Sequence, residues 1–507
     1  MSTLNAFLTS VSNLLFGTIL IWLLLGAGVW FTIRTRGLQL RHLGSMIRSV
    51  ASSRSGARGG ISSFQAFAVG LACRVGTGNI VGVALALVLG GPGAVFWMWV
   101  VALLGTATAF AEATMGQLFK VGRGDGTYRG GPAYYMARGM RLPVLGGVFA
   151  VVFMVANGLA MPMVQANAMT AALGASAGVT PWQGAVIVTV LVAPVLLGGL
   201  RSVVRVTEWL APVMASVYLA LVLVIIVTHP LQAVAAIGDI FAAAFNLRAG
   251  LAGVAGGITA ALLNGVRRGL FSNEAGLGGA ACAAGSATVA HPAQQGFVQV
   301  FGVLVDTLFV CTATALAILI AGRTDGAVYT PGVTGLEDPD VSGTLTQTAI
   351  GATLGQWTSW PMTLLVLVLA YSTILGAFSY AEVCLDYLTR APWATTTLRA
   401  AAVACTGIGG AAALSTVWTA ADVLLGIGAV LNLIALVVLT PWVVGVLRDW
   451  EAQRARVLAG TQTHAEISFS AVGNPYLPHA LPGDVWDASG AYTPSAPGQA
   501  TRGGWGY

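Results

Sequence analysis

Apolar runs of about 20 residues, separated by short polar or basic loops, recur along almost the whole chain. A bilayer core about 30 Å thick is crossed by a helix of about 20 residues, so each run predicts a membrane-spanning helix. Only 8% of the 507 residues are charged, whereas a soluble domain has about 25%. The sequence lacks the alternating segments of about 10 residues that mark a membrane β-barrel. We therefore predict an all-α polytopic membrane protein.

The apolar runs predict about eleven transmembrane helices. Their approximate bounds are 12–34, 62–90, 92–119, 143–173, 181–200, 206–228, 250–285, 295–321, 358–388, 397–415 and 419–447. Residues 38–58 are basic and are expected to lie along the membrane surface, and residues 229–249 are expected to form a short external segment.

The predicted organisation has three parts. Residues 1–60 hold the first helix and the basic interfacial segment, and residues 61–450 hold a ten-helix core. Residues 451–507 form a cytoplasmic tail, which turns polar and rich in Pro, Gly and Ser from about residue 458. Such a composition cannot bury enough apolar surface to fold, so disorder is expected there.

Basic residues gather in alternate loops, which indicates the orientation of the chain. They are Arg34, Arg36, Arg41, Arg48, Arg54 and Arg58, then Lys120, Arg123, Arg129, Arg138 and Arg141, then Arg201, Arg205, Arg390, Arg399, Arg448, Arg454 and Arg456. The long loop 322–357 is acidic instead. The net charge of +6 is thus a topology signal and does not indicate nucleic-acid binding. The alternation of basic loops predicts an external N-terminus and a cytoplasmic C-terminus in a bacterial inner membrane.

Two of the apolar runs are interrupted at their centres, by Arg-Val-Gly-Thr-Gly-Asn at 74–79 and by Phe-Ser-Asn-Glu-Ala-Gly-Leu-Gly at 271–278. Gly and Asn weaken a helix, and unwound backbone at membrane depth must face protein or a wet cavity. With the first helix set aside, these runs begin two sets of five. That order is typical of inverted-repeat secondary transporters.

The first break offers two kinds of ligand. Free N–H groups at Gly78 and Asn79 can bind a carboxylate at a helix N-terminus. Carbonyls near Ala72 and Val75, where the preceding half-helix ends, suit a hard cation. The alternative is that the glycines only allow close helix packing, but the polar residues in both breaks favour ligand binding.

Other polar residues inside the apolar runs leave their roles open. Ser372 and Thr373 can complete a sodium shell or bond back to their own helix. Gln165 and Asn167 can bind a substrate or bridge helices. Arg74 and Glu274 both belong to the breaks and are predicted to form an ion pair, because an isolated charge in the membrane is costly. Five scattered histidines form no catalytic or metal-binding pattern, so no enzyme activity is expected.

Four stretches carry a resemblance to the alanine-or-glycine:cation symporter family, also called sodium:alanine symporters. They are RVGTGNIVGVALALVLGGPGAVFWMW (74–99), RGGPAYYM (129–136), RRGLFSNEAGLGGA (267–280) and VWTAADVLLGIGAVLNLIAL (417–436). The resemblance spans roughly residues 10–450. It implies a LeuT-type fold, a 5+5 inverted repeat preceded by one extra N-terminal helix. The implied function is sodium-coupled symport of a small neutral amino acid by alternating access.

The resemblance also implies the site. The substrate-binding residues would be Thr77, Gly78, Gln165, Phe271, Ser272, Asn273, Gly276 and Ala377. The coupling ion, Na⁺, would be held by the carbonyls of Ala72, Val75 and Leu369 and the hydroxyls of Ser372 and Thr373. Where the family usually has a tryptophan, this chain has Ala377, which predicts room for a larger substrate such as glutamine. Proton coupling by the same fold, or a sensor that does not transport, are the alternatives.

Overall fold

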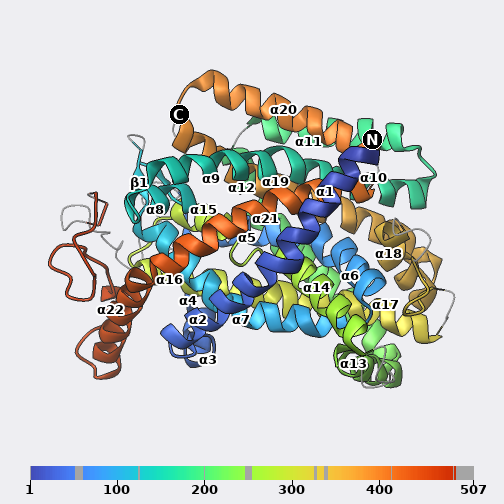
Figure 1. Ribbon diagram of the computed structural model, residues 1–507, viewed down its shortest axis with the longest axis horizontal. Helices are drawn as coiled ribbons and strands as arrows, with labels where there is room; N and C mark the ends of the chain where they lie inside the picture. The colour runs from blue at the N-terminus through green and yellow to red at the C-terminus, as the bar shows by residue number, and fades with distance from the viewer. Residues whose placement is uncertain are drawn as a thin grey trace.

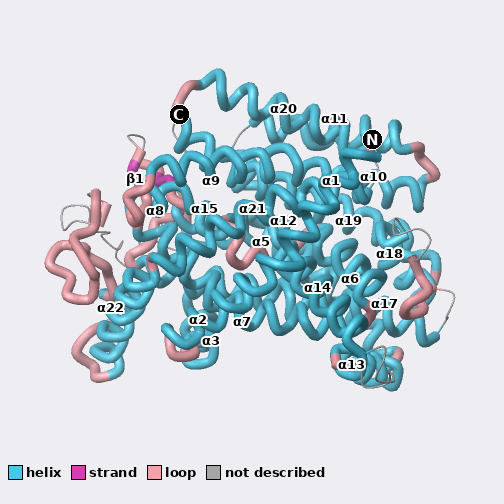
Figure 2. The backbone as a smooth tube through the Cα atoms, viewed as in Figure 1, coloured by secondary structure: helices cyan, strands magenta, loops and turns pink. Residues whose placement is uncertain are grey.

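The computed structural model describes residues 2–51, 61–123, 126–198, 200–245, 254–324, 328–335, 341–412, 414–483 and 485–486. Within these ranges the chain is almost entirely helical (Figure 2). The strands β1 (Val121–Gly122) and β2 (Tyr128–Arg129) form a small antiparallel sheet.

The helices are named in chain order, and η marks a π- or 3₁₀-helical stretch. Up to residue 244 they are α1 (Ser2–Leu14), η1 (Leu15–Leu20), α2 (Ile21–Arg34), α3 (Leu38–Arg41), α4 (Leu43–Ala51), α5 (Ser63–Arg74), η2 (Gly78–Gly82), α6 (Val83–Gly90), α7 (Gly93–Leu118), α8 (Pro132–Arg138), α9 (Pro143–Val155), η3 (Ala156–Ala160), α10 (Met161–Ala177), α11 (Pro181–Gly198), α12 (Leu200–Thr228) and α13 (Pro230–Ala244). The remainder are α14 (Val254–Asn273), α15 (Gly279–Gly285), α16 (Pro292–Val303), η4 (Leu304–Cys311), α17 (Thr312–Thr324), α18 (Ser342–Leu354), η6 (Gln356–Thr358), α19 (Ser359–Leu388), α20 (Pro392–Ala411), α21 (Leu414–Val438), α22 (Thr440–Leu458) and η7 (His464–Glu466).

Eight helices in the described residues are long and apolar enough to cross a membrane, and one bent pair of helices brings the number to nine. The eight are Ala6–Arg34, Gly93–Leu118, Pro143–Ala177, Pro181–Gly198, Arg205–Thr228, Pro292–Thr324, Gln356–Leu388 and Thr416–Val438. The bent pair is Ser63–Arg74 with Gly78–Gly90. Nine of the eleven predicted runs are matched in this way. The other two correspond to α14 with α15 and to α20, so a count of eleven stays a prediction.

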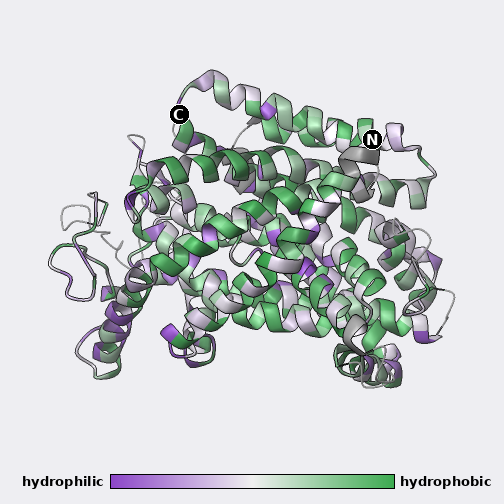
Figure 3. Cartoon of the chain, in the orientation of Figure 1, coloured by the Kyte–Doolittle hydropathy of each residue, from purple (hydrophilic) through white to green (hydrophobic). Residues whose placement is uncertain are grey.

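Apolar side chains on the outside of the bundle identify the surface that faces lipid. Helix α11 exposes Val186, Val190 and Leu191, and the helices of the bundle are coloured mostly as hydrophobic in Figure 3. Trp182 and Trp393 are exposed near the N-terminal ends of α11 and α20, as expected where indole rings sit at a membrane interface. The chain is a multi-pass membrane protein.

The two broken segments lie inside the bundle. Helix α7 packs against α14, α15 and α16, while α19 packs against α5 and α10, and α11 lies beside α20 (Figure 1). All residues in 66–87 and in 268–287 are buried. The unwound backbone therefore faces protein and not lipid, as membrane-depth polar groups require.

Two connecting segments contain helices that the sequence analysis does not predict. The predicted external segment 229–249 contains α13, and the acidic loop 322–357 contains α18. Helix α18 packs on the first broken segment, where the Thr346 hydroxyl donates to the carbonyl of Ile80 over 3.1 Å. The acidic residues Asp325, Glu337, Asp338 and Asp340 lie outside the described residues.

The tail corrects one prediction. Helix α22, a polar helix at one end of the molecule (Figure 3), continues to Leu458. Beyond it, Ile467, Phe469 and Trp486 are buried. The Trp486 indole N–H donates to the carbonyl of Gln117 over 3.2 Å. The prediction of disorder is therefore wrong for this part of the tail, because a few apolar side chains anchor it, while residues 487–507 lie outside the described residues.

Candidate functional site

The first broken segment changes direction between α5 and η2. Helix α5 begins at a capping box, in which the Gln65 amide donates to the Ser62 hydroxyl over 3.1 Å and the Ser62 amide donates to the Gln65 side chain over 2.9 Å. It ends at Arg74, after which the chain bends by 45°. A Cβ at Gly76 would lie 2.0 Å from the Thr373 hydroxyl oxygen, so only glycine allows α19 to approach this closely.

Gln165 of α10 reaches the break directly. Its side-chain oxygen accepts from the Thr77 hydroxyl over 2.8 Å and from the Thr77 amide over 3.4 Å. The Gln165 amide nitrogen is buried and has no hydrogen-bond partner among the described residues. An unpaired buried donor costs about 1–3 kcal/mol, so this nitrogen beside the free end of a half-helix is suited to receive an anionic group from a ligand.

The residues predicted to hold sodium lie together where α19 meets the end of α5. The Thr373 hydroxyl donates to the carbonyl of Ala72 over 2.9 Å and to the carbonyl of Leu369 over 3.0 Å. The Ser372 hydroxyl donates to the same Leu369 carbonyl over 2.9 Å. Val75 directly precedes Gly76, which contacts Thr373. Four oxygen atoms from two helices thus converge, and oxygen is the ligand that hard cations prefer.

The second broken segment is held by a carboxylate of the protein itself. Glu274, Gly276 and Gly278 have φ values of 57°, 96° and 109°, so the chain turns through left-handed conformations between α14 and α15. Glu112 of α7 accepts from the amides of Gly276 over 2.8 Å, Gly278 over 3.0 Å and Ala281 over 3.4 Å. The positive N-terminal end of α15 is therefore already neutralised.

Phe271 places an aromatic ring beside the first break. A Cβ at Gly78 would lie 3.2 Å from this ring, which also stacks on Trp418 with 4.6 Å between ring centroids. Arg268 lies over both rings and forms a buried ion pair with Asp422. The ring of Phe271 therefore forms an apolar wall beside Gly78.

A buried polar cluster joins the two breaks. The Asp306 carboxylate of η4 accepts from the Asn79 side-chain amide over 2.5 Å, from the Ser272 hydroxyl over 2.7 Å and from the Thr307 hydroxyl over 2.8 Å. All four residues are fully buried. Asp306 lies 227 residues from Asn79 and 34 residues from Ser272 in the sequence, and no local pattern connects these positions.

The predicted ion pair between Arg74 and Glu274 is not formed. Arg74 donates to the Gln299 side chain over 3.0 Å, and its Nε and Nη2 atoms have no partner in the structure as described. Glu274 instead accepts from the Cys73 thiol over 3.0 Å and the Tyr380 hydroxyl over 3.4 Å. The left-handed backbone at Glu274 turns its side chain toward α19.

The remaining predicted site residues make contacts within the protein itself. Asn167 bridges helices, because its side-chain amide donates to the carbonyls of Gly409 and Ala412. Asn273 caps the turn of the second break by accepting from the Ala275 amide over 3.0 Å. Gly276 is held by Glu112, and Ala377 is fully buried in the core, one turn after Thr373 on α19.

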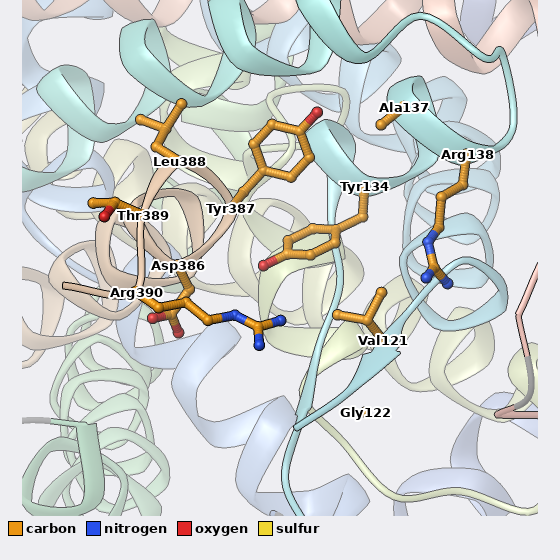
Figure 4. A pocket seen from close by; sticks show the side chains of 10 residues that line it. All are labelled: Val121, Gly122, Tyr134, Ala137, Arg138, Asp386, Tyr387, Leu388, Thr389 and Arg390. Atoms are coloured by element: carbon orange, nitrogen blue, oxygen red, sulfur yellow. The ribbon is translucent and has the colours of Figure 1, made fainter. Parts of the chain in front are cut away.

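A pocket of about 520 Å³ lies elsewhere, between the ends of α8 and α19 (Figure 4). Tyr134, Tyr387, Arg138 and Arg390 line it together with Asp386. Asp386 is 13 residues after Thr373, which is roughly 20 Å along a helix. This pocket is therefore separate from the breaks and lies at the basic end of the bundle.

Comparison with known proteins gives consistent results. The sequence profile described as the sodium:alanine symporter family matches residues 1–464. The sodium/alanine symporter AgcS of Methanococcus maripaludis is 37% identical over 86% of this chain and 94% of its own length. The probable sodium/glutamine symporter GlnT of Bacillus subtilis is 37% identical over 87% of this chain and 90% of its own length. The putative sodium/proton-dependent alanine carrier protein YrbD of Bacillus subtilis is 38% identical over 89% of this chain and 93% of its own length.

Proposed function

Because the chain belongs to the sodium:alanine symporter family and is a sodium-coupled symporter of small amino acids rather than an enzyme, we propose that the first break binds both amino acid and ion. The observation that carries this proposal is the pairing of Thr77 with Gln165, whose amide nitrogen has no partner. The sodium-type oxygen cluster at Thr373 lies against the same break.

The substrate carboxylate is proposed to lie at the amides of Thr77 and Gly78, where it would replace the long hydrogen bond of 3.4 Å from the Thr77 amide to Gln165. Their position at the start of a half-helix favours negative charge, and the Gln165 amide nitrogen supplies a further donor. The equivalent end at the second break is unsuitable, because Glu112 already accepts from its amides. Ser272, Asn273 and Gly276 are therefore assigned to shaping the pocket rather than to binding the carboxylate.

The substrate side chain is proposed to face Phe271, whose ring lies beside Gly78. Ala377, fully buried on α19, is proposed to leave room for side chains longer than that of alanine. The names of two relatives, one for alanine and one for glutamine, bracket this range. Tryptophan at position 377 would then restrict the substrate, so Ala377→Trp is expected to shift preference from glutamine toward alanine in competition uptake.

Sodium is proposed to bind between Ala72, Val75, Leu369, Ser372 and Thr373. In the structure the hydroxyls of Ser372 and Thr373 donate to the carbonyls of Leu369 and Ala72. These hydroxyls can rotate to offer lone pairs to an ion. Because the ion would hold α19 to the end of α5, its binding would favour one state of an alternating-access cycle.

The arrangement of the chain is proposed to be a LeuT-type inverted repeat of ten helices, 61–450, preceded by an extra N-terminal helix. Arginines in alternate loops favour an external N-terminus and a cytoplasmic C-terminus in the inner membrane. The pocket at Arg138 and Arg390 would then open toward the cytoplasm (Figure 4). Residues of α19 between Thr373 and Asp386 would line the exit path.

The test is uptake of labelled glycine, alanine, serine and glutamine into proteoliposomes, with sodium, lithium or potassium outside. Uptake that requires an inward sodium gradient, at fixed pH and membrane potential, supports the proposal. Equal uptake without that gradient contradicts sodium coupling. Uptake driven by a pH gradient alone would favour proton coupling, to which the name of one relative refers. Stabilisation by an amino acid without any uptake would favour a sensor.

A further inference from the structure

The pocket between the ends of α8 and α19 carries positive charge that the protein does not neutralise. Arg138 and Arg390 line it, and neither forms an ion pair with a described residue. The carboxylate in the lining, that of Asp386, already accepts from Arg123 over 3.1 Å and from Arg129 over 2.7 Å. Counted as ionised, the four arginines and the aspartate leave a formal charge of +3, so the pocket is suited to an anion.

Hydroxyl groups complete the polar lining. The Thr389 hydroxyl oxygen accepts from the Ala391 amide over 3.2 Å, and among the described residues its hydrogen has no acceptor. The rings of Tyr134 and Tyr387 lie edge to face, with 5.3 Å between their centroids. Figure 4 shows the Arg390 side chain extending beneath the ring of Tyr134. Guanidinium groups and hydroxyls are the donors that bind phosphate, and a volume of about 520 Å³ is that of a small-ligand pocket.

The pocket adjoins the surface that faces lipid. Helix α9 begins beside it at Pro143, whose carbonyl accepts from the Tyr387 hydroxyl over 2.9 Å. The outer side of α9 exposes Val144, Val148 and Val151. Trp393, three residues after Arg390, is 71% exposed, as expected at the headgroup level of a membrane. An anion held in the pocket can therefore carry acyl chains that lie along α9.

We propose that this pocket binds the head group of an anionic phospholipid, with the phosphodiester at Arg138 and Arg390 and the acyl chains along α9. Basic pockets between membrane helices are suited to such head groups. A zwitterionic head group fits less well, because its ammonium needs a free carboxylate and Asp386 is already paired with two arginines.

The proposal adds a lipid ligand to the proposed function and does not alter the substrate site. Asp386 lies roughly 20 Å along α19 from Thr373, so lipid and amino acid can be bound at the same time. Only the assignment to the cytoplasmic leaflet rests on the proposed orientation of the chain. The binding itself depends on neither the orientation nor the coupling ion.

The test is native mass spectrometry of the full-length protein in detergent, titrated with phosphatidylglycerol or with phosphatidylcholine of the same acyl chains. The first phosphatidylglycerol is expected to bind at least about tenfold more tightly than phosphatidylcholine. Arg138→Gln and Arg390→Gln should each weaken phosphatidylglycerol binding about fivefold. Arg141→Gln is the matched control, since Arg141 is exposed at the same end of the bundle but does not line the pocket. It should keep the wild-type affinity within about twofold.

An equal loss of affinity in Arg141→Gln would show diffuse attraction to a basic surface and would overturn the pocket. Equal binding of the two lipids would overturn it as well. Inorganic phosphate is the second probe, compared with phosphatidylglycerol at equal concentration by the melting temperature in detergent. The lipid should raise that temperature more. If phosphate raises it as much as the lipid, and Arg390→Gln removes both effects, the ligand is a free phosphate and the lipid proposal is wrong.

The side chain of Arg390 is exposed, so Arg390→Gln is expected to fold and carries the test even if Arg138→Gln does not. None of these measurements uses transport. Absence of sodium-dependent uptake would therefore sink the proposed function and leave the lipid site standing, whereas loss of lipid selectivity would sink the lipid site alone.

Discussion

The two broken segments look alike in sequence but differ in how their polar groups are satisfied. At the second break, Glu112 accepts from the amides of Gly276, Gly278 and Ala281, so the positive end of α15 is occupied by the protein itself. Among the described residues, the Gln165 amide nitrogen and two nitrogens of Arg74 at the first break have no hydrogen-bond partner, and at the second break the same is true of the Asn273 side-chain nitrogen. Two broken segments that look alike in sequence can therefore differ in which of their polar groups are free to bind a ligand.

The other end of α15 is fixed as well. Gln117 of α7 donates to the carbonyls of Ala284 and Ala287, and Lys120 donates to Ala287 over 2.9 Å. Trp486 of the tail covers this corner. We infer that the second break is the fixed element of the pair, and that the first break is the element that responds to ligands. The following variants test this difference, in order of their expected effect on transport.

Glu112→Gln should have the largest effect. A neutral amide accepts more weakly than a carboxylate from three amides, and hydrogen bonds to charged groups contribute about 1.5–3 kcal/mol each. We expect a clearly lower melting temperature in detergent and uptake below about 2% of the wild-type rate, which corresponds to more than about 2 kcal/mol.

Glu274→Gln provides the matched comparison for Glu112→Gln. In the described residues its side chain accepts hydrogen bonds from a thiol and a phenol and from no backbone amide. Transport should fall while the melting temperature stays near that of the wild type. If both variants melt at the same reduced temperature, the assignment of Glu112 as the anchor of the second break is wrong.

Gln165→Glu should have the next largest effect. It places a negative charge beside the position proposed for the substrate carboxylate, and we expect the amino-acid KM to rise roughly 30-fold, about 2 kcal/mol. Asn167→Ala is the control, because Asn167 contacts only backbone carbonyls of residues 409 and 412. A variant at Gln165 whose KM matches the wild type would exclude the first break as the carboxylate site.

The sequence predicted the breaks and much of their surroundings, because glycines and polar residues inside an apolar run are local signals. The polar residues alone did not separate Gln165 from Asn167, which only the family resemblance did, since both are buried amides on one helix and the packing of neighbouring helices decides their partners. Nor did the sequence predict the role of Glu112. The carboxylate lies 164 residues from the amide of Gly276 that it contacts, and no local pattern marks such a contact.

The errors have a physical reason of the same kind. The sequence predicts an ion pair between Arg74 and Glu274 because an isolated charge is costly. In the structure, Arg74 donates to the side chain of Gln299 and Glu274 accepts from the thiol of Cys73, and both partners are distant in sequence. The average composition of the tail predicts disorder, whereas three buried side chains, Ile467, Phe469 and Trp486, suffice to dock it. In both cases tertiary contacts override a rule that is correct on average.

Thr373→Ala should affect sodium more than substrate. One hydroxyl oxygen of the proposed shell is lost, and we expect the sodium concentration for half-maximal uptake to rise about fivefold, near 1 kcal/mol. The ranking of glycine, alanine, serine and glutamine should stay unchanged. Thr363→Ala is the control. Thr363 lies nearer the start of the same helix α19, and its hydroxyl donates a hydrogen bond to the carbonyl of Ser359. A change below about twofold for Thr373→Ala would rule out the hydroxyl as a ligand.

Trp486→Ala should have the smallest effect on transport, below about twofold, because the indole contacts Gln117, Lys120 and Phe469 at the end of the bundle and not the proposed binding residues. Its effect should appear in stability instead. Lys120 lies between the rings of Trp486 and Tyr128, and burial lowers the pKa of its ammonium from 10.5 to about 7. Between these values the unfolded chain binds more protons than the folded chain, so the free energy of unfolding should rise with pH from about 7 to about 10.5. Removing the indole admits water, raises the pKa of Lys120 and flattens this rise. Melting temperatures in detergent across that pH range measure the slope. An identical slope in the wild type and the variant would show that Trp486 does not shield Lys120, and the corner would then not be held by the tail.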